Sequence, residues 1–115
     1  MRWEVILVEE VEQWYLALDQ DTAAQVTAAI ELLEDQGPTL PRPFCDRVQG
    51  SKYHAMKELR PGSTGTTEVR VLFIFDPRRQ AVLLVAGDKS GEWRTWYRRA
   101  VPLAERRYEQ YLKEQ

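Results

Sequence analysis

The clearest pattern of hydrophobic and polar positions lies between residues 68 and 97. Apolar side chains at 69, 71, 73 and 75 alternate with positions 70, 72 and 74, which predicts a strand with two distinct faces. Residues 76–79, Asp-Pro-Arg-Arg, are typical of a turn. The apolar run at 81–85 predicts a second strand, so this region should form a β-hairpin followed by a charged, aromatic segment.

The N-terminal third of the chain predicts one strand and two helices. Residues 3–8 are rich in β-branched and aromatic side chains, as in a strand. Val11, Trp14, Tyr15 and Leu18 then follow helical spacing. Residues 19–21 interrupt that pattern and offer an N-cap for a second helix at about residues 22–36, which Gly37 and Pro38 should end. The two helices should form a hairpin.

The remaining segments complete an α+β pattern. Residues 37–52 contain three prolines and two glycines, which predicts a loop. Residues 53–60 read as a strand, although helix propensity also allows a helix there. A last helix should begin at Pro102. The order β-α-α-β-β-β-α predicts an α+β fold: a four-stranded, mainly antiparallel sheet packed by the helical hairpin, with a C-terminal helix. We expect residues 1–115 to form a single domain.

Charge is distributed unevenly along the chain. Residues 1–51 contain 3 Lys and Arg against 10 Asp and Glu, whereas residues 52–107 contain 12 against 6. This asymmetry favours a polyanion site on one face of the protein, although two ordinary solvated surfaces would also account for it.

Composition argues against several classes of site. Cys45 is the only cysteine and His54 the only histidine, so we expect no intramolecular disulfide, no metal cluster and no cysteine-based nucleophile. The N-terminus predicts no signal peptide, and no apolar run is long enough to span a membrane. We therefore expect a cytoplasmic protein without a membrane partner.

Cations on the predicted sheet are the strongest candidates for chemistry. Arg70 interrupts an apolar strand, where it needs solvent or a partner such as Glu58 or Glu68. Alternatively its guanidinium could bind phosphate oxygens. Lys57, Arg60 and Lys89 should lie on neighbouring strand ends, and together with Arg70 they would form a phosphate clamp.

An aromatic segment follows these cations. Tryptophans in a basic loop suit base stacking, but Trp96 and Tyr97 could equally anchor the last helix. His54 is a candidate acid or base, or a structural residue. The candidate set for binding a nucleic acid, which the resemblance given below makes an RNA-binding set, is Arg60, Trp93, Arg94, Trp96, Arg98 and His54, with Arg99 adding further positive charge.

Four segments together resemble a known family. These are KELR at 57–60, RVLFIFDPRR at 70–79, LLVAGDKSGEWRTWY at 83–97 and PLAERRYEQYL at 102–112. In order and spacing they look like the phage-derived HigB-like toxins of the RelE/ParE toxin–antitoxin superfamily. The resemblance covers nearly the whole chain.

The resemblance implies a toxin that is a ribosome-dependent mRNA endonuclease and inhibits translation. It implies that the enzyme uses no metal or other cofactor. It also implies a cognate antitoxin that neutralises the toxin, expected to be of the helix-turn-helix type. It places the central strand arginine at Arg70 and the basic residue after the last strand at Lys89. Glu58 stands where the RelE branch has a lysine. The implied catalytic set is Arg70, Lys89, Lys57, Glu58 and Tyr97, with Glu58 or His54 as base and Tyr97 as acid.

Two other functions remain open from the sequence. A ParE-like gyrase inhibitor would share the fold and act by binding. A non-catalytic or inactive interaction module would fit the modest net charge of −2. It would also fit the ambiguous place of the C-terminal tyrosine that the RelE branch uses, for which Trp93, Trp96 and Tyr97 all compete.

Overall fold

The computed structural model describes residues 2–115. A five-stranded sheet forms its centre, in the spatial order β1-β5-β4-β3-β2. Only β1 and β5 run parallel, while the other neighbours are antiparallel. The strands are β1 (Glu4–Leu7), β2 (Cys45–Arg47), β3 (Lys57–Leu59), β4 (Val69–Phe75) and β5 (Gln80–Asp88).

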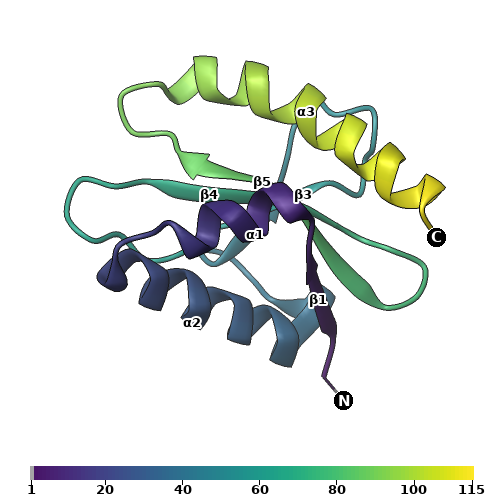
Figure 1. Ribbon diagram of the computed structural model, residues 1–115, viewed down its shortest axis with the longest axis horizontal. Helices are drawn as coiled ribbons and strands as arrows, with labels where there is room; N and C mark the ends of the chain where they lie inside the picture. The colour runs from purple at the N-terminus through teal and green to yellow at the C-terminus, as the bar shows by residue number, and fades with distance from the viewer. Residues whose placement is uncertain (1) are drawn as a thin grey trace.

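Three α-helices cover the sheet (Figure 1), and a 3₁₀ turn, η1 (Gly37–Thr39), follows the second of them. The hairpin of α1 (Glu9–Leu16) and α2 (Gln20–Gln36) packs on one face, and α3 (Trp93–Lys113) packs on the other. Asp19 caps α2 as predicted, because its carboxylate accepts the Thr22 backbone N–H at 3.1 Å. The predicted α+β arrangement is therefore confirmed.

Three predicted features differ from the structure: the number of strands, the length of β3 and the start of the last helix. The sheet has five strands, not four, because residues 45–47 of the predicted loop pair with β3. Three residues are too few for alternation to be recognised, and nearby prolines hide the strand. Strand β3 is also shorter than predicted. The last helix begins at Trp93, nine residues before Pro102, which lies inside the helix on its exposed side.

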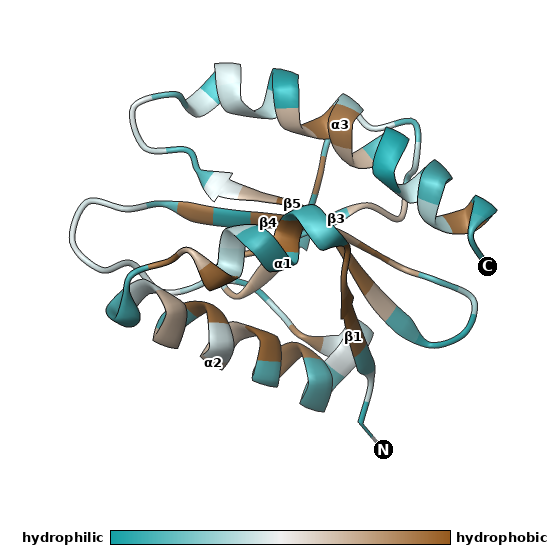
Figure 2. Ribbon diagram, viewed as in Figure 1, coloured by the Kyte–Doolittle hydropathy of each residue, from teal (hydrophilic) through white to brown (hydrophobic). Residues whose placement is uncertain are grey.

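Alternation along β4 decides which residues face each helical layer. Val69, Val71 and Phe73 join the core beneath α1 and α2, whereas Leu72 and Ile74 join the core beneath α3. Figure 2 shows hydrophobic residues along these strands and hydrophilic ones on much of the helices. Because side chains alternate, Arg70 lies on the α3 face of the sheet.

A bulge in β5 provides an additional tie to α3. Leu72 pairs with Val85 and Phe73 with Leu83, so Leu84 has no partner residue in β4. Its carbonyl accepts a hydrogen bond from Arg107 Nη1 at 2.9 Å. Arg107 Nε also lies 3.6 Å from a Glu10 carboxylate oxygen on α1. The cost of leaving a buried carbonyl unpaired is thus avoided by a side chain of the covering helix.

Within the described residues, no helix combines the length and apolar character that crossing a membrane requires.

The turn between β4 and β5 is fixed by a buried carboxylate. Asp76 accepts the backbone N–H groups of Arg78 and Gln80 through one oxygen, and the Tyr111 hydroxyl, at 2.6 Å, through the other. Burial and this bond raise the pKa of Tyr111 to about 12. The C-terminal part of α3 is thereby attached to the hairpin that carries Arg70.

We predict that Tyr111→Phe lowers the free energy of unfolding by about 1–3 kcal/mol, because Asp76 loses a charge-assisted hydrogen bond while staying buried. Urea denaturation followed by circular dichroism measures this. Lys113→Met, an exposed change on the same helix, serves as the control and should change stability by less than about 0.5 kcal/mol. Equal stability of Tyr111→Phe and the wild type would contradict the assigned role.

Candidate active site

A buried carboxylate, Glu58, lies at the centre of the candidate site. It belongs to β3 and is only 3% exposed. Its Oε2 atom accepts a hydrogen bond from Arg60 Nε at 2.8 Å, and Arg60 Nη2 lies 2.7 Å from the same oxygen as an ion-pair contact. Its Oε1 atom accepts the Tyr97 hydroxyl at 2.5 Å. Each oxygen therefore has a different partner, and the orientation of the carboxylate is fixed.

Arg60 connects Glu58 to the edge strand. Its Nη2 atom lies 3.2 Å from Asp46 Oδ2 on β2, and Arg42 donates to the same oxygen from Nε at 3.0 Å. The Arg47 backbone N–H and Arg42 hold the pKa of Asp46 below its usual value. Because Arg60 forms ion pairs with two carboxylates, its main role is to hold the Glu58 side chain in place.

Arg70 lies half-buried beside this pair, and its hydrogen-bonding groups are only partly paired. Its side chain is 16% exposed, and Nε lies 3.9 Å from Glu58 Oε2. Nη1 donates to the carbonyl of Val69 at 2.8 Å. Among the described residues, Arg70 Nε has no hydrogen-bond partner. Glu58 is therefore an ion-pair partner of Arg70, as predicted, but at a distance that leaves the buried Nε donor without a hydrogen bond.

Lys89 is the second cation with spare donors. It is 4% exposed and follows the end of β5, where its backbone N–H bonds the Glu68 carbonyl at 3.0 Å. Its Nζ atom lies 4.3 Å from the ring centroid of Trp93 and 5.3 Å from that of Tyr97. In residues 2–115 no carboxylate forms an ion pair with it. Burial, and next the positive charge of Arg70, lower the pKa of Lys89.

Tyr97 completes the cluster from the first turns of α3. Burial and then its bond to Glu58 raise the pKa of Tyr97. Its ring contacts Trp96 edge-on, with centroids 5.1 Å apart. A Cβ atom on Gly87 would lie 2.8 Å from the Trp96 indole nitrogen, so the glycine opposite Arg70 in β5 makes room for Trp96. Trp96 thus supports Tyr97 from the core.

The structure brings together most of the residues proposed from the sequence. Glu58, Arg60, Arg70, Lys89 and Tyr97 form one cluster, which we call the Glu58 cluster. Trp93 lies at its rim, 61% exposed. Asp46 was not predicted, because the three-residue strand that carries it was missed.

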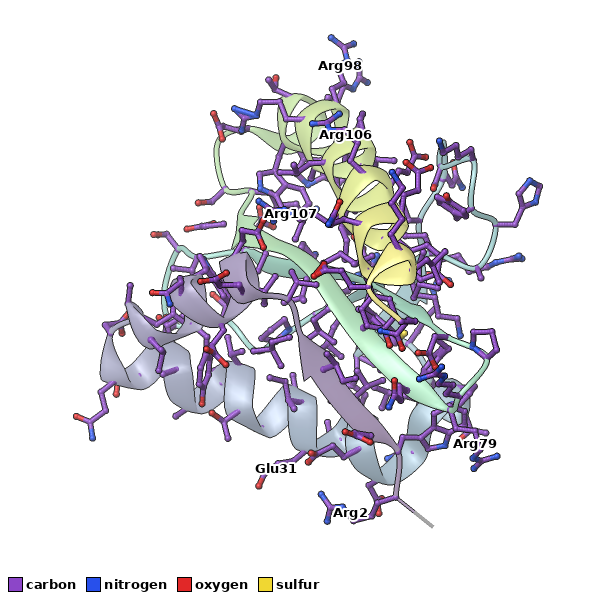
Figure 3. The ribbon with its side chains drawn as sticks, turned by 45° about the vertical axis from the view of Figure 1, so that its right-hand side comes forward. Arg2, Glu31, Arg79, Arg98, Arg106 and Arg107 are labelled. Carbon is purple, nitrogen blue, oxygen red and sulfur yellow. The ribbon has the colours of Figure 1, made fainter. Side chains whose placement is uncertain are left out.

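Four predicted residues lie outside the cluster or project away from it. Lys57 faces the opposite side of the sheet, where its Nζ atom lies 5.6 Å from the Phe75 ring centroid. His54 is exposed in the loop before β3. Arg94 and Arg98 are exposed on α3, and Figure 3 shows Arg98 projecting away from the body of the protein. Trp96 is buried, which limits it to a supporting role.

Two hollows flank Arg60. One, of about 310 Å³, is lined by residues that include Glu58, Tyr97 and Trp93. The other, of about 420 Å³, includes Arg70 and the loop around Ser63. A chain lying across Arg60 would therefore meet Arg70 on one side and the tyrosine and tryptophan on the other.

Charge separates the two faces of the protein. The acidic residues of the first half lie largely on the α1–α2 layer, where Glu31 is labelled, whereas α3 carries Arg98, Arg106 and Arg107 (Figure 3). No three His, Cys, Asp or Glu side chains gather as a metal-binding group within residues 2–115. The Glu58 cluster itself offers guanidinium, ammonium, phenol and carboxylate groups.

Sequence comparison decides the family. Residues 13–109 match the family described as phage-derived protein Gp49-like. The chain belongs to this family. It is 53% identical to the candidate toxin HigB3 of Mycobacterium tuberculosis, over 94% of this chain and 92% of that protein. It is also 49% identical to the candidate toxin HigB2 of the same organism, over 91% of this chain but only 52% of that longer protein.

Structure comparison gives the wider fold. A double arginine-to-alanine variant of the Escherichia coli toxin RelE, in its free state, aligns with a TM-score of 0.62 and 12% identity. The alignment covers 89% of this chain and 97% of RelE. The chain is thus a HigB-like toxin of a toxin–antitoxin system, with a RelE-like fold, as the resemblance implied.

The buried ammonium of Lys89 should cost the free protein stability. Folding disfavours the charged form of Lys89, because its pKa is lowered by burial. This cost is present while the folded protein holds the proton, and it disappears as the pH rises from the lowered pKa to the ordinary one.

We predict that Lys89→Met raises the free energy of unfolding near neutral pH, by roughly 1 kcal/mol or more. The gain should shrink at strongly alkaline pH. Urea denaturation at both pH values measures it, with Lys113→Met as the matched exposed control. A loss of stability near neutral pH would mean that Lys89 has a stabilising partner.

Proposed function

We propose that this toxin is a metal-independent, ribosome-dependent endoribonuclease that cleaves mRNA and so inhibits translation. The observation that carries the proposal is a pair of cations, the half-buried Arg70 and the buried Lys89, whose side-chain donors are not all paired, beside the Tyr97–Glu58 hydrogen bond. Burying a positive charge without a full partner destabilises the free protein, and an anion that binds during function would relieve this cost. A scissile phosphate is such an anion.

The reaction needs three things of the site. The ribose 2′-oxygen must attack in line, the charge that develops on the phosphate must be neutralised, and protons must be moved. Arg70 and Lys89 provide the charge stabilisation, in a site whose donors are already oriented. Glu58 and Tyr97 are the groups that can accept or donate a proton. His54 lies outside the cluster, which favours Glu58 over it as the base.

Binding of the RNA chain would use the surface around the cluster. Trp93 is exposed on the side of its ring that Lys89 does not occupy and offers a stacking face for a base. Arg94 and Arg98 would attract the backbone from α3. Arg60 would meet the phosphate only by sharing donors with Glu58 and Asp46. We further propose a cognate antitoxin of the helix-turn-helix type as the protein partner.

We predict that Arg70→Ala abolishes mRNA cleavage, by about 100-fold or more, without unfolding the protein, because a charge-stabilising donor is lost. Primer extension on a reporter mRNA in a reconstituted bacterial translation reaction, with and without ribosomes, measures this. Arg106→Ala, an exposed arginine on α3 away from the cluster, is the matched control and should cleave like the wild type.

Discrete, ribosome-dependent cuts that disappear only in Arg70→Ala would establish the proposed function. Full cleavage by that variant would remove Arg70 from the mechanism. If the wild type makes no cuts and translation continues, a gyrase supercoiling assay tests whether the protein acts by binding instead.

A further inference from the structure

The Tyr97–Glu58 hydrogen bond changes the roles that the sequence assigned to these residues. In the sequence analysis, Glu58 or His54 was the expected base, and Tyr97 was a separate acid. In the structure the Tyr97 hydroxyl donates to Glu58 Oε1 at 2.5 Å. A phenol has a single proton, so this hydroxyl cannot at the same time donate to a leaving oxygen, whereas its own oxygen can still accept a proton.

Glu58 lines the same hollow as Tyr97, but both of its carboxylate oxygens are already engaged by protein donors. It is 3% exposed, and Arg60 engages its Oε2 atom twice. The remaining oxygen is covered by the Tyr97 hydroxyl. Tyr97 is less buried and lines the same hollow as Trp93. Any proton that reaches Glu58 from RNA would therefore pass through Tyr97.

We propose that Tyr97 and Glu58 act in series as a proton relay on the attacking 2′-hydroxyl, while Lys89 protonates the leaving oxygen. The inference rests on the proposed function and deepens it by assigning the direction of each proton.

The relay balances as follows. The 2′-oxygen forms a bond to phosphorus as its proton passes to Tyr97 Oη, and the original Tyr97 proton passes to Glu58 Oε1. The bond from phosphorus to the 5′-oxygen breaks, and that oxygen takes a proton from the Lys89 ammonium. The products are a 2′,3′-cyclic phosphate and a 5′-hydroxyl. Glu58 ends protonated and Lys89 neutral, and exchange with water restores both.

The position of Lys89 fits the acid role. Its Nζ atom lies 5.3 Å from the Tyr97 ring centroid, and its contacts are with aromatic rings and not with a carboxylate. Its Nζ donors are therefore not committed to a carboxylate, and an oxygen that enters beside Trp93 would reach them. Because burial lowers the pKa of Lys89, the ammonium gives up its proton more readily than a solvent-exposed lysine would.

A change of leaving group separates the two roles. We would place a short synthetic mRNA in bacterial ribosomes and measure single-turnover cleavage at one mapped position. A second mRNA carries a 5′-bridging sulfur at that position, because a thiolate leaves without needing a proton. The variants are Tyr97→Phe, Glu58→Gln and Lys89→Met. Glutamine keeps an acceptor oxygen for Tyr97 but takes no proton.

On ordinary mRNA each variant should lose about 100-fold or more in rate, the usual contribution of a general acid or base. On the sulfur-containing mRNA, Lys89→Met should recover to within about 10-fold of the wild type, because the step that needs the acid is bypassed. Tyr97→Phe and Glu58→Gln should stay slow, because the attacking oxygen still has to lose its proton.

Two controls exclude a merely structural effect. Tyr53 donates to Glu109 at 2.7 Å outside the cluster, so Tyr53→Phe removes a comparable tyrosine–carboxylate bond and should cleave normally. Lys113→Met is the matched lysine control. Each variant should melt cooperatively and bind an uncleavable mRNA that carries a 2′-O-methyl group at the cut.

Recovery of Tyr97→Phe on the sulfur-containing mRNA would make Tyr97 the acid and overturn the relay. Wild-type cleavage by Glu58→Gln would remove Glu58 as the acceptor. Either result leaves the proposed function intact. A wild-type protein that cuts neither mRNA would remove the proposed function and the relay together.

Discussion

The site depends on one buried carboxylate. Glu58 is 3% exposed, and an ionised carboxylate in such a place is tolerated only when its oxygens are fully engaged. Arg60 and Tyr97 engage them, and Asp46 in turn holds Arg60. Loss of any one partner would leave a buried charge unpaired in the protein interior. The network therefore holds the phenol and the guanidinium in fixed positions on rigid strands.

The two-layer fold supplies the surroundings that this network needs. Helix α3 covers one face of the sheet, and its first turns bring Tyr97 and Trp96 above β4 and β5. Gly87 leaves space for the Trp96 indole. At the other end of α3, Tyr111 and Arg107 attach the helix to the Asp76 turn and to the Leu84 bulge. The position of Tyr97 thus depends on contacts along the whole length of the helix.

Alternation and helical spacing were enough to predict most of the fold. The faces of β4 followed directly from its sequence, which puts Arg70 opposite Val69, Val71 and Phe73, but that α3 covers the Arg70 face is a finding of the structure. Strand β2 was missed, because three residues carry no readable period. The early start of α3 was also missed, since Pro102 suggested a first turn, whereas burial of Ala100, Val101 and Ala104 on the sheet keeps the helix continuous through it.

The candidate site was only partly predictable. Residue type and spacing identified Arg70 and Lys89, and the family resemblance added Glu58 and Tyr97, but neither gave their mutual contacts. Lys57 and Glu58 are neighbours in sequence, and one residue decides which face of the sheet each side chain reaches. The register of the short strand β3 gives the α3 face to Glu58 and the opposite face to Lys57. That register depends on long-range pairing, which the sequence alone does not reveal.

The central claim is that this cluster cuts RNA by attack of the ribose 2′-hydroxyl, assisted by its own side chains. The most direct test is mass spectrometry of the ends produced from a ribosome-bound mRNA, together with a matched mRNA that has a single 2′-deoxyribose before the cut. The account predicts 2′,3′-cyclic phosphate ends on the ordinary mRNA and no cut in the deoxy substrate. Cleavage of the deoxy substrate, or 3′-hydroxyl ends on the ordinary mRNA, would contradict it.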